Sequence, residues 1–157
     1  MKIREIEKRD NEAVEKLIRE CLIEFGANKP GFAWTDPQLG KFYVLYSSKP
    51  KSKYWVVEDR GQIVAGCGIG PVEGIENTCE LQKMYSLKEY RGCGVAKELL
   101  NLSIEYAAEN YEACYLETLS STIAANKSYS KNGFEKLERP IIESEHFACD
   151  SWYLKRL

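Results

Sequence analysis

The stretch Arg91-Gly92-Cys93-Gly94-Val95-Ala96-Lys97 decides the fold, because it joins a strand-like segment to a helix-like segment through two glycines. Glycine lacks a Cβ atom, so Gly92 and Gly94 allow a sharp bend or the close approach of a ligand. The first N–H groups of the following helix have no partner within it, and the helix dipole places about half a positive charge there. Arg91 and Lys97 add formal positive charge. The stretch therefore predicts a site for a phosphorylated ligand.

Three phosphate-binding patterns can be compared with this stretch. A Walker A loop requires Gly-x-x-x-x-Gly-Lys-Ser/Thr, and the stretch has neither that spacing nor that hydroxyl group. A dinucleotide fingerprint requires Gly-x-Gly-x-x-Gly, but Lys97 stands in the third glycine position and the loop lies beyond mid-chain. The pattern Arg/Gln-x-x-Gly-x-Gly/Ala is satisfied by Arg91, Gly94 and Ala96. A glycine turn that merely starts a helix is the structural alternative.

Length and composition indicate one ordinary globular domain over residues 1–157, since 44% of the residues are hydrophobic. The formal net charge of −2 gives no general attraction to nucleic acid or to an anionic membrane, and no apolar run is long enough to cross a bilayer. The 6 cysteines are spaced singly and His146 is the one histidine, which argues against a metal site. Buried reduced thiols and the absence of an apolar signal region favour a cytoplasmic protein.

Apolar periodicity and turn residues predict an α+β domain with a mixed sheet. Asp10 is the expected N-cap of the first helix, Asp59-Arg60-Gly61 has the chemistry of a hairpin turn, and Gly133 is the expected stop of the last helix. The strands are expected over 1–5, 54–58, 62–69, 78–85, 114–119, 134–138 and 152–155, and the helices over 10–25, over 37–46, from the glycine loop to about 110, and from 121 or 122 to 132.

Three segments of the chain resemble the GNAT acetyltransferase superfamily in content and order. They are Glu80 to Ser86, Tyr90 to Leu100 and Ala125 to Phe134. The predicted order of strands and helices is also similar to that family, so the resemblance covers nearly the whole chain, although only residues 80–134 are specific. It implies a single-domain α+β fold whose mixed, mostly antiparallel sheet is flanked by about four helices. It also implies direct transfer of acetyl from acetyl-CoA to a primary amine in a ternary complex.

The resemblance further implies which residues hold acetyl-CoA. Backbone amides of the glycine loop would bind its pyrophosphate, and the preceding strand would pair with the pantetheine arm through its backbone. Ser86 stands where the family often has Val, which backbone contacts tolerate. Asn126 matches a residue that commonly contacts pantetheine, its alternative being a solvated polar residue of the helix. The cofactor-binding residues expected on this basis are Met84, Tyr85, Ser86, Arg91, Gly92, Cys93, Gly94, Val95, Ala96, Lys97 and Asn126.

Tyr129 is the expected catalytic acid, because it lies four residues before Gly133, where the family usually places the tyrosine that protonates the departing thiolate. A phenol suits this role, since its pKa near 10 keeps it protonated at neutral pH. The alternative is a tyrosine that packs on the apolar face of the helix beside Phe134. Cys93 is interpreted as a small loop residue and not as a nucleophile, because the family transfers acetyl directly.

The catalytic base is expected to be Glu80, which stands eleven residues before Arg91, an offset that resembles the catalytic glutamate of the histone acetyltransferase branch. A base is needed because an alkyl amine is neutral in only about one molecule per few thousand at pH 7. Glu117 on the next strand and His146 in the last long loop are the alternatives, and the amine proton can also leave through water.

The acceptor is expected to be a small-molecule or peptide amine, and the sequence does not choose among polyamine, amino acid, antibiotic, peptide N-terminus and protein lysine, or restrict the acyl group to acetyl. An aromatic-rich region could line an amine slot or form core packing. A non-catalytic acyl-CoA sensor is the alternative function, and a homodimer is compatible with the resemblance. The aromatic residues in question are Phe25, Phe32, Trp34, Phe42, Tyr43 and Tyr46.

Overall fold

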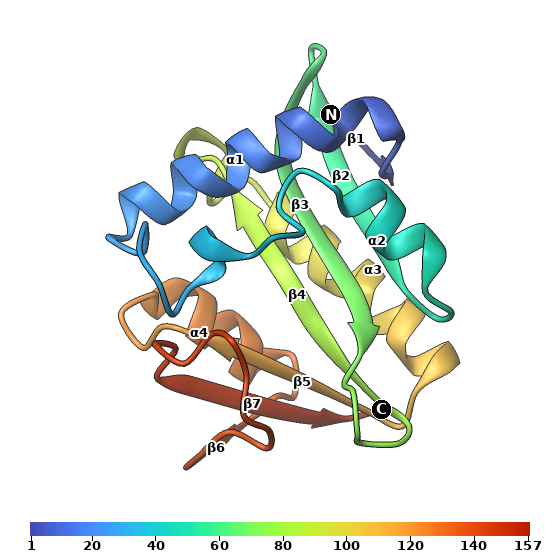
Figure 1. Cartoon of the computed structure of the whole chain (residues 1–157), viewed down its shortest axis with the longest axis vertical. Helices are drawn as coiled ribbons and strands as arrows, with labels where there is room; N and C mark the ends of the chain where they lie inside the picture. The colour runs from blue at the N-terminus through green and yellow to red at the C-terminus, as the bar shows by residue number, and fades with distance from the viewer.

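A computed structural model describes residues 1–157 as one seven-stranded sheet in the order β1-β2-β3-β4-β5-β7-β6 (Figure 1). Neighbouring strands are antiparallel except β4 and β5, which are parallel. No helix combines the length and apolar character needed to cross a membrane. The strands are β1 (Lys2–Glu5), β2 (Lys53–Asp59), β3 (Gln62–Pro71), β4 (Thr78–Ser86), β5 (Ala113–Thr118), β6 (Glu135–Leu137) and β7 (Ser151–Arg156), the α-helices are α1 (Asn11–Glu24), α2 (Phe42–Ser48), α3 (Val95–Asn110) and α4 (Ile123–Lys131), and the 3-10 helices are η1 (Lys8–Asp10), η2 (Ala33–Thr35) and η3 (Lys88–Tyr90).

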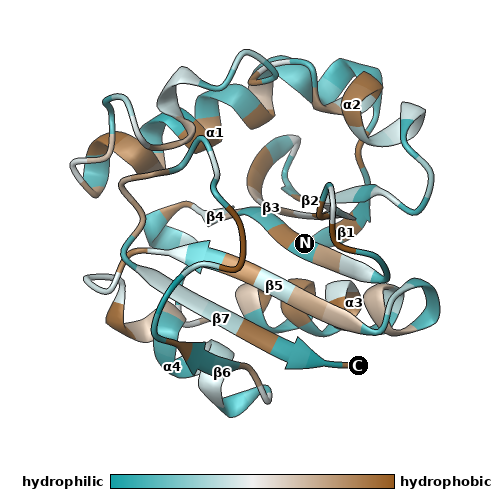
Figure 2. Ribbon diagram, turned by 60° about the horizontal axis from the view of Figure 1, so that its bottom comes forward, coloured by the Kyte–Doolittle hydropathy of each residue, from teal (hydrophilic) through white to brown (hydrophobic).

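Helices cover both faces of the sheet, with α1 and α2 on one face and α3 and α4 on the other (Figure 2). Strand β2 serves both cores, because successive side chains of a strand point to opposite faces. Tyr54 and Val56 belong to the core under α1 and α2, whereas Trp55 and Val57 belong to the core over α3 and α4. The expected α+β architecture with a mixed, mostly antiparallel sheet is confirmed.

Two local expectations are confirmed by backbone geometry. Arg60 and Gly61 both have positive φ, +50° and +78°, which is the conformation required at the two central residues of a tight hairpin turn. Gly133 has a φ of +86° directly after α4, as expected of a glycine that ends a helix.

The predicted bounds of the second helix were wrong, whereas the predicted position of Asp10 is confirmed. The second helix runs over Phe42–Ser48 and not over 37–46, because Gly40 has a φ of +88° and the N–H of Lys41 closes a turn on the carbonyl of Gln38. A left-handed residue at position 40 interrupts any helix that begins at 37. Asp10 is the N-cap residue of α1, as expected, but its carboxylate makes no capping hydrogen bond to this helix.

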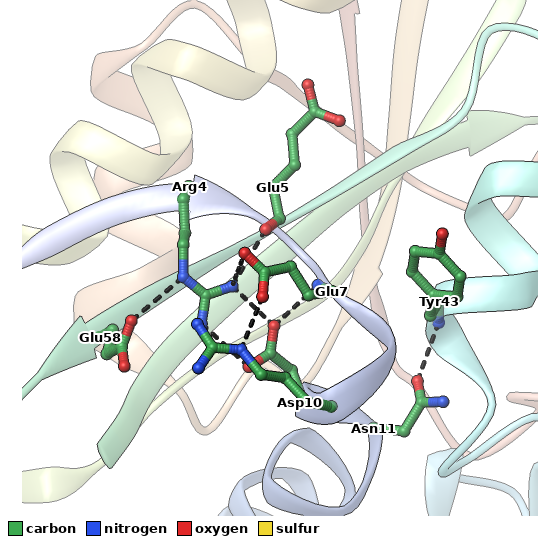
Figure 3. Close-up of polar contacts among 8 residues, drawn as sticks. Arg4, Glu5, Glu7, Asp10, Asn11, Tyr43 and Glu58 are labelled. Carbon is green, nitrogen blue, oxygen red and sulfur yellow. Dashed lines mark hydrogen bonds and ion pairs between the residues drawn. The ribbon is translucent and has the colours of Figure 1, made fainter. Parts of the chain in front are cut away.

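The Asp10 carboxylate instead takes part in a buried polar cluster that fixes α1 to the sheet (Figure 3). Arg4 on β1 donates to both Asp10 oxygens, at 2.7 and 2.9 Å, and its Nε donates to Glu58 on β2 at 3.1 Å. Asn11 accepts a hydrogen bond from the backbone N–H of Tyr43 at 2.9 Å and so joins the start of α1 to α2. These contacts hold the two helices that cover one face of the sheet.

Strands β4 and β5 separate soon after they begin. Their pairing extends only from Thr78 to Glu80 on β4, opposite Ala113 to Tyr115 on β5. Beyond this point β4 pairs with β3 and β5 pairs with β7, and the two strands diverge toward α1 and α4 (Figure 1). The edge of β4 that faces β5 is therefore free of strand partners after Glu80.

Strand β4 is also irregular at this point. Lys83 has a φ of +50°, and the pairing of β3 with β4 shifts register between Gly66 and Gly68. Such a bulge re-aims the side chains that follow it. The bulge has no signature in the sequence, whereas the family resemblance implies that β4 diverges from its neighbour.

Candidate functional site

A cleft of about 750 Å³ lies at the divergence of β4 and β5. It is lined by both strands, by the first turns of α3 and α4, by α1, α2 and their connection, and by the segment before β7. Eight of the sequence-predicted site residues line this cleft, namely Glu80, Met84, Tyr85, Ser86, Arg91, Gly92, Ala96 and Tyr129, whereas Cys93, Gly94, Val95, Lys97 and Asn126 do not.

The glycine loop presents a row of unused hydrogen-bond donors at the start of α3. The backbone N–H groups of Gly92 through Lys97 donate to no group of the chain. Gly92 and Gly94 have φ values of +77° and +91°, and a Cβ atom on either would meet no protein atom within 4 Å. Val95 is buried and anchors the loop in the core. Free N–H groups, open space and a helix N-terminus together fit an anionic group such as a phosphate.

Arg91 stabilises the start of the glycine loop through contacts with α1 and with the end of β4. Its guanidinium donates to both carboxylate oxygens of Glu24 at 2.6 and 2.8 Å and to the backbone carbonyl of Ser86 at 2.9 and 3.2 Å, and it lies over the ring of Phe25. The charge expected at this position is therefore paired with the end of α1. Lys97 remains exposed without an ion pair.

Glu80 is half-buried at the point where the two strands part. Its Oε1 accepts a hydrogen bond of 2.9 Å from Nε2 of Gln82. Burial raises the pKa of the Glu80 carboxyl, the Gln82 hydrogen bond lowers it, and the negative charge of Glu117 raises it further. Across the split on β5, Glu117 Oε1 and the hydroxyl of Tyr115 are buried without hydrogen-bond partners. Glu80 and Glu117 form no ion pair with the chain's own cations.

Tyr129 reaches the cleft from α4. Its ring packs against Phe134 and Tyr153, with centroid distances of 6.0 and 5.8 Å, while its hydroxyl makes no hydrogen bond within the chain. Burial raises the pKa of this phenol above its ordinary value, so it stays protonated at neutral pH. The Tyr129 side chain therefore both packs against Phe134 and lines the cleft, so the two interpretations of this residue do not exclude each other.

One polar cluster at the cleft was not predicted from the sequence, and it is formed by Asp36, Lys83 and His146. Lys83 Nζ lies 2.5 Å from Asp36 Oδ2, and His146 Nε2 lies 3.0 Å from the same oxygen and 3.1 Å from Lys83 Nζ. Burial would raise the pKa of Asp36, but contacts with His146 and Lys83 lower it. The sequence indicates only His146 as a candidate, because these three residues come together only in the folded chain.

Asn126 is fully engaged with the chain itself. Its Nδ2 donates to the carbonyls of Leu119 and Thr122 at 2.9 and 2.7 Å, and its Oδ1 accepts from the hydroxyls of Ser151 and Tyr153 at 3.0 and 2.7 Å. The Asn126 side chain therefore joins α4 to β7.

The aromatic residues divide between two environments. Phe42 and Tyr46 are buried and pack on Tyr54, with centroid distances of 5.1 and 5.2 Å. Arg19 lies over the ring of Trp34 at 4.7 Å. Tyr43 is exposed and does not line the cleft. Of the six aromatic residues considered for an amine slot, four line the cleft: Phe25, Phe32, Phe42 and Tyr46.

Comparisons with known proteins agree on one family. Residues 50–136 match the family model described as acetyltransferase (GNAT) domain. The chain is 39% identical over 159 residues to the uncharacterized N-acetyltransferase YjgM of Escherichia coli K12, covering 99% of this chain and 94% of that protein.

Solved structures show the same fold. A GNAT-family acetyltransferase of Staphylococcus aureus Mu50 superimposes with a TM-score of 0.84 at 23% identity, covering 99% of this chain and 98% of that one. The PaiA N-acetyltransferase of Thermoplasma acidophilum, solved in complex with coenzyme A, superimposes with a TM-score of 0.75 at 18% identity, covering 99% and 98%.

Proposed function

The chain belongs to the GNAT family of acetyl-CoA-dependent N-acetyltransferases, and on that premise we propose that it transfers acetyl directly to a primary amine bound beside the cofactor in its cleft. The observation that carries the proposal is that one cleft is bordered by the glycine loop, by the carboxylate of Glu80 and by the phenol of Tyr129. The groups that would bind phosphate, accept a proton and donate a proton can therefore all reach one bound pair of substrates.

The residues present fit acetyl-CoA. The unused N–H groups of Gly92 through Lys97 would hold its pyrophosphate, and the open space beside Gly92 and Gly94 lets the phosphates approach the backbone. The pantetheine arm would run along the unpaired edge of β4 at Met84 to Ser86, as an added strand does at a free sheet edge. PaiA, which is similar in fold, was solved with coenzyme A. Arg91 and Asn126 would act by fixing the loop and the start of α4.

Each side chain then has one task. The bound cofactor supplies an acetyl thioester whose carbonyl carbon the amine attacks and whose thiolate departs. Glu80 accepts the amine proton at its carboxylate, directly or through water, and it must be ionised to do so. Tyr129 donates its hydroxyl proton to the departing sulfur, and its raised pKa keeps that proton available. Glu117 is half-buried across the split and its Oε1 has no hydrogen-bond partner, so it would attract the incoming ammonium and is the alternative base.

The test is a coenzyme A release assay with acetyl-CoA and a panel of polyamines, amino acids and peptides, together with thermal unfolding. We expect stabilisation by acetyl-CoA and turnover with at least one amine. Tyr129→Phe should lower kcat by about 10²-fold or more while leaving the affinity for acetyl-CoA near that of the wild type. Unchanged turnover in Tyr129→Phe would contradict the acid role. Stabilisation by acetyl-CoA with no turnover on any amine would support a non-catalytic sensor instead.

The pH dependence of kcat tests the base. Because burial raises the pKa of Glu80, we expect kcat to rise with pH along an acidic limb that lies above the ordinary carboxyl range. Glu80→Gln should remove this limb and most of the turnover. A limb that survives in Glu80→Gln and disappears in Glu117→Gln would transfer the role to Glu117.

A further inference from the structure

A continuous line of hydrogen bonds leads from the α2 side of the cleft to Glu80. The hydroxyl of Tyr46 on α2 donates to Gln82 Oε1 at 2.8 Å, and Gln82 Nε2 donates to Glu80 Oε1 at 2.9 Å. Both distances lie in the ordinary range of strong hydrogen bonds. Gln82 is the one residue of the chain that donates a hydrogen bond to this carboxylate.

Glu80 and Tyr46, at the two ends of this line of hydrogen bonds, determine the direction in which the hydrogen bonds are donated. An ionised carboxylate can only accept hydrogen bonds, so the amide of Gln82 must turn its NH₂ group toward Glu80 and its oxygen away. Burial raises the pKa of Tyr46 well above its ordinary value, so this phenol retains the proton that it donates to the amide oxygen. Tyr46 thereby holds Gln82 in the orientation that favours the charged form of Glu80.

Two glycines of β3 leave space for the side chains of Gln82 and Tyr46. A Cβ at Gly70 would lie 3.0 Å from Gln82 Oε1, and a Cβ at Gly68 would lie 2.9 Å from the ring of Tyr46. Neither glycine has positive φ, so neither is required by backbone conformation. Their absent side chains instead leave the space that Gln82 and Tyr46 occupy.

We propose that Gln82 and Tyr46 are positioning residues that hold the Glu80 carboxylate ionised and aimed into the cleft, an inference that rests on the proposed role of Glu80 as the base. Gln82 acts on Glu80 directly, and Tyr46 acts through Gln82.

Other charged and titratable groups also face Glu80, and none of them replaces Gln82. Glu117 on β5 opposes ionisation of Glu80, while Lys83 on β4 and His146 before β7 favour it through space. Tyr115, which pairs with Glu80 from β5, and Cys149 before β7 also lie near this carboxylate, and burial raises the pKa of both groups, so both stay uncharged at neutral pH. Lys83 and His146 are both engaged with Asp36. Removing the Gln82 donor therefore leaves burial and Glu117 as the dominant influences on Glu80.

The experiment measures the pH dependence of kcat at saturating acceptor and acetyl-CoA in six proteins: wild type, Gln82→Met, Tyr46→Phe, Gly70→Ala, Glu80→Gln and the control Tyr106→Phe. Loss of one hydrogen bond to a charged group should raise the apparent pKa of the acidic limb by about one unit in Gln82→Met. Turnover below the limb then falls about tenfold and recovers at higher pH. Tyr46→Phe and Gly70→Ala should shift the limb in the same direction by less, because both leave the amide in place. Tyr106→Phe is the control, since its hydroxyl on α3 makes no hydrogen bond and it lies outside the cleft.

The possible outcomes separate this inference from the proposed function. If Glu80→Gln leaves the limb unchanged, Glu80 is not the base and the proposed mechanism fails first. If Glu80→Gln removes the limb but Gln82→Met and Gly70→Ala both leave its position unchanged, the positioning role is overturned. Gly70→Ala keeps every side chain of the line, so a folding defect in Gln82→Met does not remove the test. An equal loss of kcat at all pH values, with no shift of the limb, would indicate a purely structural role and would also overturn the inference.

Discussion

Replacing Gly94 by alanine should weaken cofactor binding far more than it weakens the fold. Gly94 has a φ of +91°, and a Cβ there would meet no protein atom within 4 Å. The left-handed conformation costs a non-glycine residue about 1–2 kcal/mol, so the melting temperature should fall by roughly 2–8 °C. The methyl group would occupy the space through which phosphate oxygens reach the free N–H groups. Loss of one such charged hydrogen bond corresponds to at least about a tenfold loss of affinity.

Gly74 supplies the matched control. Its φ is +85°, a Cβ there would also meet nothing within 4 Å, and it lies in the connection that precedes β4, whereas the glycine loop follows β4. Gly74→Ala should therefore lower the melting temperature by a similar amount and leave coenzyme A binding unchanged. The difference between the two variants isolates the approach of the ligand from the backbone strain.

Thermal unfolding with and without coenzyme A, together with titration calorimetry, measures both effects. At a ligand concentration of about 100 times the wild-type Kd, binding stabilises the native state by about 2.7 kcal/mol, and a tenfold weaker Kd reduces this to about 1.4 kcal/mol. Equal coenzyme A affinity in Gly94→Ala and Gly74→Ala would refute the reasoning, because the loop would then hold no phosphate.

Three further predictions concern stability. Arg4→Met leaves the buried Asp10 carboxylate without its main donor and should destabilise the fold by about 2–4 kcal/mol in urea titrations. Because burial would raise the pKa of Asp10 but Arg4 lowers it, the stability that this pair contributes is present above about pH 4 and disappears as the pH falls through the lowered pKa, so the wild-type advantage should shrink in acid. Glu24→Gln breaks an ion pair that is about one-third exposed, between Arg91 and Glu24, and should cost less than about 1 kcal/mol; a cost as large as that of Arg4→Met would contradict the role of burial. Gly68→Ala places a Cβ 2.7 Å from a buried tyrosine ring and should lower stability by about 1–3 kcal/mol, whereas an unchanged melting temperature would show that the ring moves freely.

The fold followed from local patterns wherever those patterns were strong. The hairpin at Arg60-Gly61, the long helices and the stop at Gly133 each rest on chemistry that acts within a few residues, and all were predicted. The second helix was misplaced because its apolar spacing extends back to Leu39, while the conformation of Gly40 leaves no trace in that spacing. Asp10 was placed correctly, but its partner, Arg4, comes from another element.

The candidate site was predictable only in part for the same reason. The glycine loop and Tyr129 lie within contiguous motifs, and Tyr129 and part of the loop, namely Arg91, Gly92 and Ala96, line the cleft. The pairing of Arg91 with Glu24 spans 67 residues, and the contact of His146 with Asp36 spans 110. Such contacts depend on how α1 and the segment before β7 fold over the sheet. The role of Gln82 has no sequence signature, because its hydrogen bond with Tyr46 forms only through the packing of α2.

The short pairing of β4 with β5 has a consequence for how the molecule opens. Only three residue pairs join β4 to β5 at the middle of the sheet. Little inter-strand hydrogen bonding therefore connects β1–β4 with β5–β7, although α3 links the two halves along the chain. This seam should be a boundary between two cooperative unfolding units, and amides along it should exchange with solvent through openings smaller than global unfolding. A cofactor that contacts both β4 and β5 would stabilise the closed arrangement of these two strands. Slower deuterium uptake in β5 and β7 on addition of coenzyme A, with little change in β2, would then report occupancy before any acceptor is known.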